Sequence, residues 1–159
     1  MAQATDPTIQ PQPLRMSRVL QAGRAAVFAA WSSREQVMQW FAPATYTVSD
    51  ARIACHAGGA FEVCMRSPGG VEHWTRGTFV EVVPPSRLVI DMRVSDLQQK
   101  LLFTAHTVVG FAEDPAGTRL DVAQSYAFVD PAMAAPMVAG AAEGWRTTLD
   151  KLEKLAGGM

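Results

Sequence analysis

The last part of the chain carries the feature that most constrains the fold, an amphipathic stretch from Pro136 to Leu155. At 100° per residue, its apolar side chains fall on one stripe of a helix: Val138, Ala141, Ala142, Trp145, Leu149 and Leu152. Polar residues lie opposite: Arg146, Thr147, Asp150 and Lys154. Such a helix is about 30 Å long. It therefore needs an extended apolar surface to cover, which the preceding residues must supply.

The apolar stripe of this helix changes size along its length. Its first half holds only Val138, Ala141 and Ala142, whereas its second half begins at the bulky Trp145. We expect Trp145 to anchor the helix, and we expect room for a cavity beside the small half. Asp130 before Pro131 predicts a capped turn, with the main helix beginning at Pro136, and the glycines from Gly157 predict its end.

The rest of the chain predicts one strand, two short helices and then six strands. Alternation predicts the first strand at 14–21, and a helical pattern follows at 25–31. A second helix opens at a capping box formed by Ser33 with Gln36 or Ser32 with Glu35. Alternation then returns in the segments 46–53, 60–66, 71–83, 87–94, 101–113 and 118–128.

Turns of two to five residues predict that consecutive strands pair as an antiparallel meander. We expect an α+β fold with six to seven strands in a curved antiparallel sheet, wrapped around the C-terminal helix. The two short helices after the first strand would close one end. Residues 14–156 form a single domain in this interpretation, and the proline-rich segment 1–13 is a disordered tail.

Composition excludes several classes of function. The net charge is −1, without runs of like charge, and no apolar stretch reaches the length of a membrane span. We therefore expect neither a nucleic-acid nor a membrane partner. The N-terminus is unlike a signal peptide, so we expect a cytoplasmic protein whose Cys55 and Cys64 stay reduced.

Cofactor and metal sites are not predicted. The chain has neither a phosphate-binding loop nor a dinucleotide fingerprint. Cys55 and His56 are adjacent, so they splay to opposite faces of an extended chain. No spacing matches a structural zinc site, and nothing orients a base on either thiol.

Several motifs together resemble a known family. They occur in the order Phe28-Ala29-Ala30-Trp31, Gln39-Trp40-Phe41-Ala42-Pro43, Gly58-Gly59-Ala60-Phe61, 76–88 (RGTFVEVVPPSRL), Gly117-Thr118-Arg119-Leu120 and 144–152 (GWRTTLDKL). In this the chain resembles the activator of Hsp90 ATPase homologue 1-like family of the START/Bet v 1-like (SRPBCC) superfamily. The resemblance implies the helix-grip fold. Superfamily members include ligand carriers, cyclases and a chaperone-activating domain, so the fold does not select a function.

A mainly apolar interior between sheet and helix is the candidate site. Strand parity places His73 on the face of Phe79, unless a bulge reverses it, whereas His106 points outward and His56 lies in a turn. The candidate ligand-binding residues are Phe28, Trp31, Trp40, Phe61, Met65, His73, Phe79, Phe103, Phe111, Gln124, Tyr126 and Trp145. The alternative is that these side chains simply fill the core.

Three functions are candidates for this chain. The first is non-catalytic binding of a small hydrophobic or aromatic molecule. The second is a cyclase or hydrolase-like enzyme that uses His73 with Tyr126 or Arg76. The third, by resemblance only, is interaction with an Hsp90-type chaperone. The sequence leaves open whether the protein forms a homodimer.

Overall fold

The structure is a computed structural model and describes residues 13–159. The tail predicted at 1–13 thus lies outside the described residues, except for Pro13. The elements follow one another as β1 (Leu14–Leu20), α1 (Arg24–Ser32), α2 (Arg34–Trp40), β2 (Thr47–Ile53), β3 (Phe61–Arg66), β4 (Glu72–Val83), β5 (Arg87–Ser95), β6 (Leu101–Asp114), β7 (Gly117–Phe128), a 3-10 turn (Pro131–Met133) and α3 (Ala134–Ala156). The predicted order of elements is confirmed.

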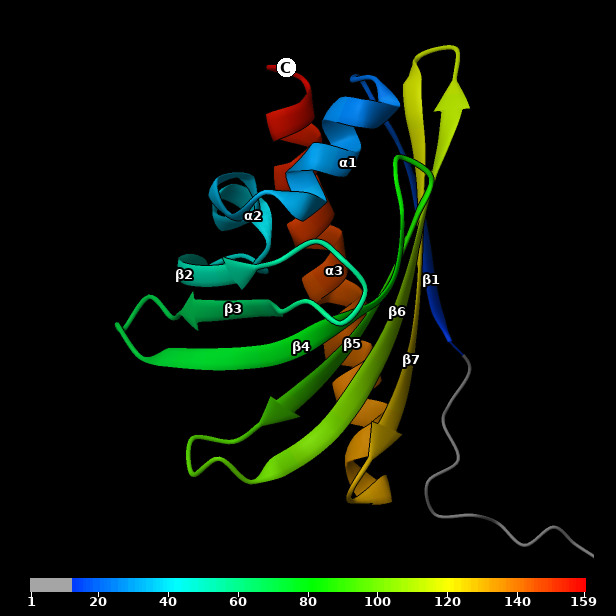
Figure 1. Cartoon of the computed structure of the whole chain (residues 1–159). Helices are drawn as coiled ribbons and strands as arrows, with labels where there is room; N and C mark the ends of the chain where they lie inside the picture. Colours follow the sequence, from blue (N-terminus) through cyan, green and yellow to red (C-terminus); the bar gives the residue numbers. More distant parts are fainter. Residues whose placement is uncertain (1–12) are drawn as a thin grey trace, which may run out of the picture.

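The strands form one antiparallel sheet in the order β1-β7-β6-β5-β4-β3-β2. Six strands are the predicted meander, and β1 pairs with β7 from Leu14 opposite Gln124 to Leu20 opposite Thr118. Figure 1 shows the sheet curling around α3, with α1 and α2 at one end of the concave side. This arrangement confirms the helix-grip architecture.

The sheet bends sharply within β4. The first half of β4 pairs with β3 up to Thr75, and the second half pairs with β5 from Arg76 onward. Gly77 lies at this change of partner, where a Cβ would come within 2.6 Å of the Asp91 carbonyl oxygen and 3.0 Å of the Phe61 carbonyl oxygen. Only glycine fits such a close approach of three strands. Gly77 thereby permits the sharp curvature of the sheet.

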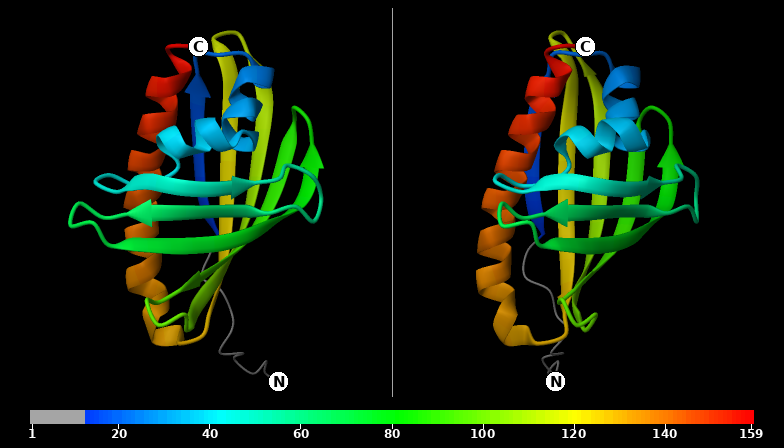
Figure 2. Two further views of the ribbon diagram at one scale, coloured as in Figure 1. Left: turned by 60° about the vertical axis from the view of Figure 1, so that its left-hand side comes forward. Right: turned by 90° about the vertical axis from the view of Figure 1, so that its left-hand side faces the viewer.

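Helix α3 lies along the concave face from one end of the sheet to the other (Figure 2). Its second half is packed tightly, because Trp145, Leu149 and Leu152 are buried there. Arg18 of β1 fastens the same half, since its guanidinium lies 2.9 Å from an Asp150 carboxylate oxygen and 3.1 Å from the Arg146 carbonyl oxygen. The first and last elements of the domain are thereby joined.

Aromatic side chains fill the end of the interior beneath α1 and α2. Trp31 packs edge-on against Trp40, with ring centroids 4.8 Å apart, and stacks on Trp145 at 6.2 Å. The indole N–H of Trp40 donates to the Ala30 carbonyl oxygen at 2.9 Å. Such pairs add about 0.5–1.5 kcal/mol beyond area burial. This end of the molecule is a solid core.

Three local predictions need correction. Helix α3 begins at Ala134 rather than Pro136; Pro136 is tolerated because amide groups in the first helical turn need no intrahelical partner. The capping box does not form, since the Ser33 side chain makes no hydrogen bond to the backbone of α2. Thr147 is half-buried rather than solvated, and its hydroxyl oxygen accepts a hydrogen bond from the Ala44 amide.

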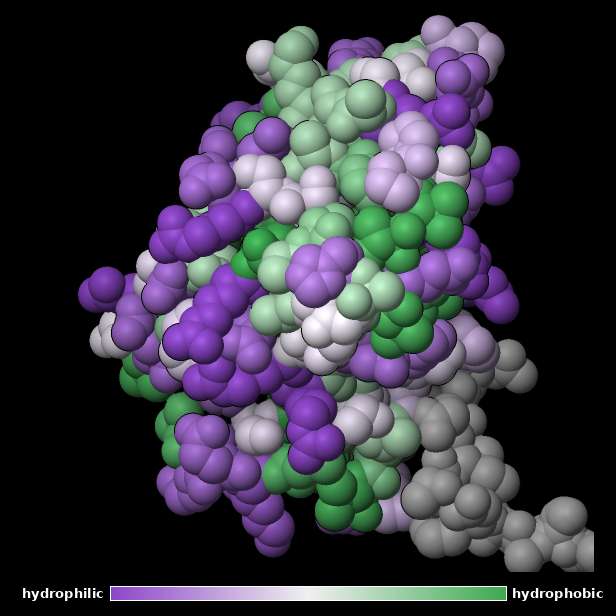
Figure 3. All heavy atoms as spheres, viewed as in Figure 1, coloured by the Kyte–Doolittle hydropathy of each residue, from purple (hydrophilic) through white to green (hydrophobic). Residues whose placement is uncertain are grey.

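The outer surface is mixed in character. In Figure 3 hydrophilic residues spread over the visible face, with apolar residues in smaller groups between them. Across the turn between β4 and β5, Arg87 Nε lies 2.9 Å from Glu81 Oε1. His106 is exposed as expected and contacts Asp91. None of the helices within residues 13–159 is both long and apolar enough to cross a bilayer.

Candidate functional site

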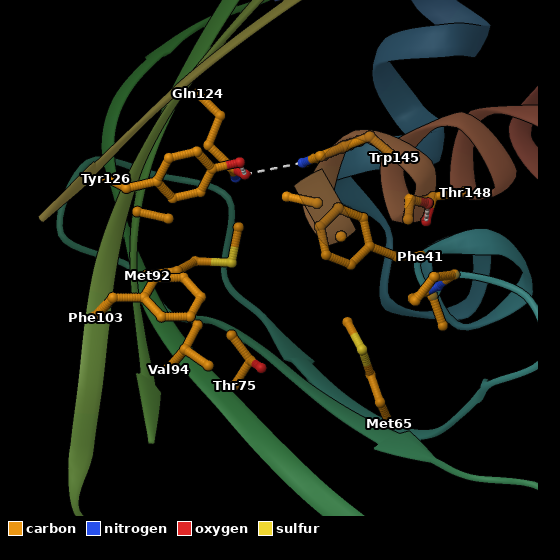
Figure 4. Close-up of a pocket in the computed structure, with 16 residues that line it drawn as sticks. Phe41, Met65, Thr75, Met92, Val94, Phe103, Gln124, Tyr126, Trp145 and Thr148 are labelled. Atoms are coloured by element: carbon orange, nitrogen blue, oxygen red, sulfur yellow. Dashed lines mark hydrogen bonds between the residues drawn. The ribbon is translucent and has the colours of Figure 1, made fainter. Parts of the chain in front are cut away.

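A cavity of about 270 Å³ lies between the first half of α3 and the concave face of the sheet. Figure 4 shows side chains from α3 on one side and from β3 to β7 on the other, pointing toward the same space. The lining consists of Phe41, Ala42, Pro43, Met65, Thr75, Met92, Val94, Phe103, Ala105, Gln124, Tyr126, Gly140, Ala141, Gly144, Trp145 and Thr148.

Small residues on α3 make the space. Gly140, Ala141 and Gly144 line the cavity over one turn of the helix, and Trp145 ends it on the side of the aromatic core. A Cβ on Gly140 would meet no other atom within 4 Å, so close packing does not require glycine there. The cavity thus lies beside the small half of the helix, as predicted, although Val138 and Ala142 are not part of its wall.

The mouth of the cavity is marked by the more exposed lining residues. Gly140 is exposed, and Met65, Val94 and Phe103 are half-buried. At the end of the molecule away from α1 and α2, the first turns of α3 approach the β5–β6 loop (Figure 2). The deep end is formed by the fully packed Trp145 and Phe41, whose rings are 5.8 Å apart.

One polar cluster interrupts the apolar wall. Gln124 of β7 is buried, and its amide nitrogen donates to Thr107 Oγ1 at 2.7 Å. Its carbonyl oxygen accepts the indole N–H of Trp145 at 2.9 Å and the hydroxyl of Tyr126. Buried polar groups that are paired in this way lose little free energy on leaving water. This cluster therefore ties α3 to β7 through Trp145.

Burial raises the pKa of Tyr126 from the usual 10.0 to about 12. The cause is desolvation, which disfavours the phenolate. Tyr126 is consequently protonated at neutral pH, and its hydroxyl group donates its hydrogen to Gln124 Oε1.

Two hydroxyl groups complete the polar part of the wall. Thr148 donates to the Gly144 carbonyl oxygen at 2.7 Å, within its own helix. Thr75 of β4 is buried at the opposite side of the cavity. No charged side chain is among the described residues that line the cavity.

The structure places five of the twelve predicted site residues on the cavity wall: Met65, Phe103, Gln124, Tyr126 and Trp145. Six others belong instead to the solid aromatic core: Phe28, Trp31, Trp40, Phe61, Phe79 and Phe111. Their large rings pack against one another in that core rather than bordering the cavity. Contact of any residue with a ligand stays a prediction.

His73 does not line the cavity. It lies opposite Met65 in the sheet, but its ring nitrogen Nε2 is hydrogen-bonded to the Ser95 carbonyl oxygen. Arg76 lies on the other face, where it pairs with Glu62 at 3.1 Å. The structure therefore does not bring His73 or Arg76 into the cavity with Tyr126.

Eleven of the lining residues were not predicted from the sequence. Met92 and Val94 share the face of Leu88 and Ile90 in β5, and Thr75 shares the face of Phe79. Their parity could have identified them, whereas Gly140 and Gly144 offer no side chain to suggest a site. Pro43 and Ala42 lie between elements, so no periodicity places them.

The cysteines and histidines form no second site. Cys55 and Cys64 are free thiols, and burial raises the pKa of Cys55. Within residues 13–159, no three His, Cys, Asp or Glu side chains are close enough together to hold a metal ion.

A curled antiparallel sheet that grips a C-terminal helix across an internal cavity defines the helix-grip class of the START/Bet v 1-like superfamily. Within that class the chain belongs to the activator of Hsp90 ATPase homolog 1-like family, which it matches over residues 21–157. The predicted family is confirmed.

Solved structures show the same fold. A protein from Rhizobium leguminosarum is 25% identical, with a TM-score of 0.78, and the match covers 96% of this chain and 100% of that one. A protein from Nitrosomonas europaea is 24% identical, with a TM-score of 0.76 and coverage of 92% and 94%. The AHSA1 protein from Silicibacter pomeroyi is 23% identical, with a TM-score of 0.75 and coverage of 92% and 99%. A comparison with curated proteins gives no match.

Proposed function

We propose that this protein binds a small hydrophobic or aromatic molecule in the cavity between α3 and the sheet. The observation that carries the proposal is the 270 Å³ space bounded by apolar side chains beside a helix segment built from Gly140, Ala141 and Gly144. Membership of the family is consistent with this function but does not specify it.

The glycines of α3 that line the cavity lower the stability of the helix. A glycine inside a helix is about 0.8–1 kcal/mol less favourable than alanine. At Gly140 there is space for a side chain, so packing does not account for the glycine. At this exposed position, glycine leaves the entrance to the cavity without a side chain.

The size of the cavity suits a molecule of about two rings. A designed cavity of about 150 Å³ in another protein stays free of water and binds benzene. The present cavity is nearly twice as large, at about 270 Å³. Removing an apolar molecule of this size from water contributes about 25 cal/mol per Å² of buried surface before the entropic cost of association.

Naphthalene is a direct probe of this proposal. Titration calorimetry should show saturable binding of one molecule per chain. Because Trp145 lines the cavity, tryptophan fluorescence should change with the same saturation curve. A series of one-, two- and three-ring hydrocarbons that gives no saturable binding would overturn the proposal.

A cavity-filling variant locates the binding. Ala141 is half-buried on the wall, so Ala141→Phe should weaken naphthalene binding at least tenfold. The matched control is Ala139→Phe, which makes the same change on the exposed side of the same helix and should leave binding unchanged. Equal affinity for both variants would place the ligand elsewhere.

The other two functions stay predictions. Catalysis by His73 with Tyr126 or Arg76 lacks geometric support, because the three side chains do not meet. Interaction with an Hsp90-type chaperone, suggested by the family's description, has no described contact that bears on it.

A further inference from the structure

The polar atoms of the cavity wall are few and uncharged. Apart from backbone groups, they belong to Thr75, Gln124, Tyr126, Thr148 and the indole of Trp145. A ligand with a carboxylate or phosphate would be buried here without a counter-ion. The uncompensated desolvation of a charge costs several kcal/mol, so the wall selects against anions and cations alike.

Most hydrogens of these polar groups are already used. The Tyr126 hydroxyl and the Trp145 indole both donate to Gln124 Oε1, and both lone pairs of that oxygen are thereby occupied. The Thr148 hydroxyl donates to the backbone of its own helix. One amide hydrogen of Gln124 is committed to Thr107.

Beside the second amide hydrogen of Gln124, the unused capacity of the wall consists mainly of acceptors. A hydroxyl oxygen that donates its hydrogen still has lone pairs, and this holds for both Tyr126 and Thr148. The Thr75 hydroxyl, for which the described residues provide no hydrogen-bond partner, can rotate to either role. Tyr126 and Thr148 also come from the two elements that enclose the cavity, β7 and α3, so an acceptor oxygen is available on either side.

We propose that the ligand of this cavity is a neutral molecule of about two rings that presents one hydroxyl or N–H hydrogen to the phenolic oxygen of Tyr126. This inference rests on the proposed function, since it names the chemical class of the molecule bound in the same cavity. It distinguishes such a ligand from a pure hydrocarbon and from a fatty acid or other amphiphilic anion.

Four naphthalene compounds test the inference with the wild-type protein at neutral pH. They are naphthalene, 2-methoxynaphthalene, which only accepts, 2-naphthol, which donates, and 2-naphthoate, which is charged. One net hydrogen bond contributes about 0.5–1.5 kcal/mol, so 2-naphthol should bind about 2- to 12-fold more tightly than naphthalene. The ether should not share this gain, and 2-naphthoate should bind at least tenfold more weakly than naphthalene.

The Tyr126→Phe variant assigns the acceptor. Binding of 2-naphthol should weaken more than binding of naphthalene, so that the preference for 2-naphthol is lost. Tyr46→Phe is the matched control, because Tyr46 is exposed, and it should change neither affinity.

The outcomes separate the two proposals. Failure of all four compounds to bind the wild-type protein overturns the proposed function. Binding of naphthalene without a preference for 2-naphthol overturns only the inference drawn here. Equal weakening of both ligands by Tyr126→Phe, or loss of the preference in Thr75→Val instead, overturns the assignment to Tyr126. The wild-type series is decisive even if a variant does not fold.

Discussion

At the scale of single residues, Gln124 links the sheet to α3 through side-chain hydrogen bonds. Its amide is the partner of three buried side chains, Thr107, Tyr126 and Trp145. Each of these would otherwise leave a polar group unpaired, at a cost of about 1–3 kcal/mol. A glutamine at this position therefore fixes both the orientation of Trp145 and the direction of the Tyr126 hydrogen, which together define the polar part of the cavity wall.

Tyr126 supplies a pH-dependent prediction. Its pKa in the folded protein is raised to about 12, above the usual 10.0, because burial disfavours the phenolate. A group with a raised pKa stabilises the fold fully below its unfolded pKa, and that contribution disappears as the pH rises through the folded pKa. The free energy of unfolding should therefore fall between about pH 10 and pH 12.

Comparison with Tyr126→Phe isolates this effect from other groups that titrate in alkali. The difference between wild type and variant in near-ultraviolet tyrosinate absorbance should have its midpoint near pH 12 when the protein is folded. In denaturant, the midpoint should move toward 10. A midpoint near pH 10 in the folded protein would show that the phenol is not desolvated.

At the scale of elements, replacing a glycine by alanine should have opposite effects on the free energy of unfolding in α3 and in β4. Gly140→Ala should raise the free energy of unfolding by about 0.5–1 kcal/mol, because alanine is the better helix former and its methyl group meets no atom within 4 Å. Gly77→Ala should lower it by about 1–3 kcal/mol, since the methyl group would overlap two strand carbonyl oxygens at the bend.

Denaturant unfolding of both variants measures these changes. The dependence on denaturant concentration should stay the same, so that a shifted midpoint reports stability alone. A destabilised Gly140→Ala protein would mean that the start of α3 is not helical in solution. A neutral Gly77→Ala protein would contradict the close approach of β3, β4 and β5.

Element positions were largely predictable from the sequence, and the strands show why. Each of β5 to β7 buries one face along most of its length, so apolar alternation marks it almost to its ends. The pairing of β1 with β7 was not predictable, because about a hundred residues separate Leu14 from Gln124 and no local pattern links them.

The interior was predictable only in part. Sequence parity identifies side chains that face the concave surface, and it placed Phe79 and Phe103 on that surface correctly. Whether an inward side chain fills the core or borders a cavity depends on what lies across from it. Phe79 meets Phe61 at 5.5 Å, whereas Phe103 lies beneath the small residues of α3. That difference exists only in three dimensions.

At the scale of the whole molecule, the interior has a solid half and a hollow half. All the fully buried positions of α3 occur from Trp145 to Ala156, against the aromatic core below α1 and α2. The segment 134–144 contributes Gly140, Ala141 and Gly144 to the cavity wall and contains no buried residue. Local opening is easiest where few apolar contacts are lost, so the hollow half should open more readily than the solid half.

Hydrogen exchange tests this division of the molecule. Backbone amides in 138–144, beyond the first turn of α3, should exchange faster than those in 145–152. Fraying alone cannot explain this result if the last helical turn, 153–156, is better protected than the segment beside the cavity. Ala141→Phe fills the space from the helix side, so it should slow exchange in 138–144 and leave 145–152 unchanged. Uniform protection along α3 would show that the cavity does not weaken the helix above it, and that the first half of α3 is held by contacts as extensive as those of the second.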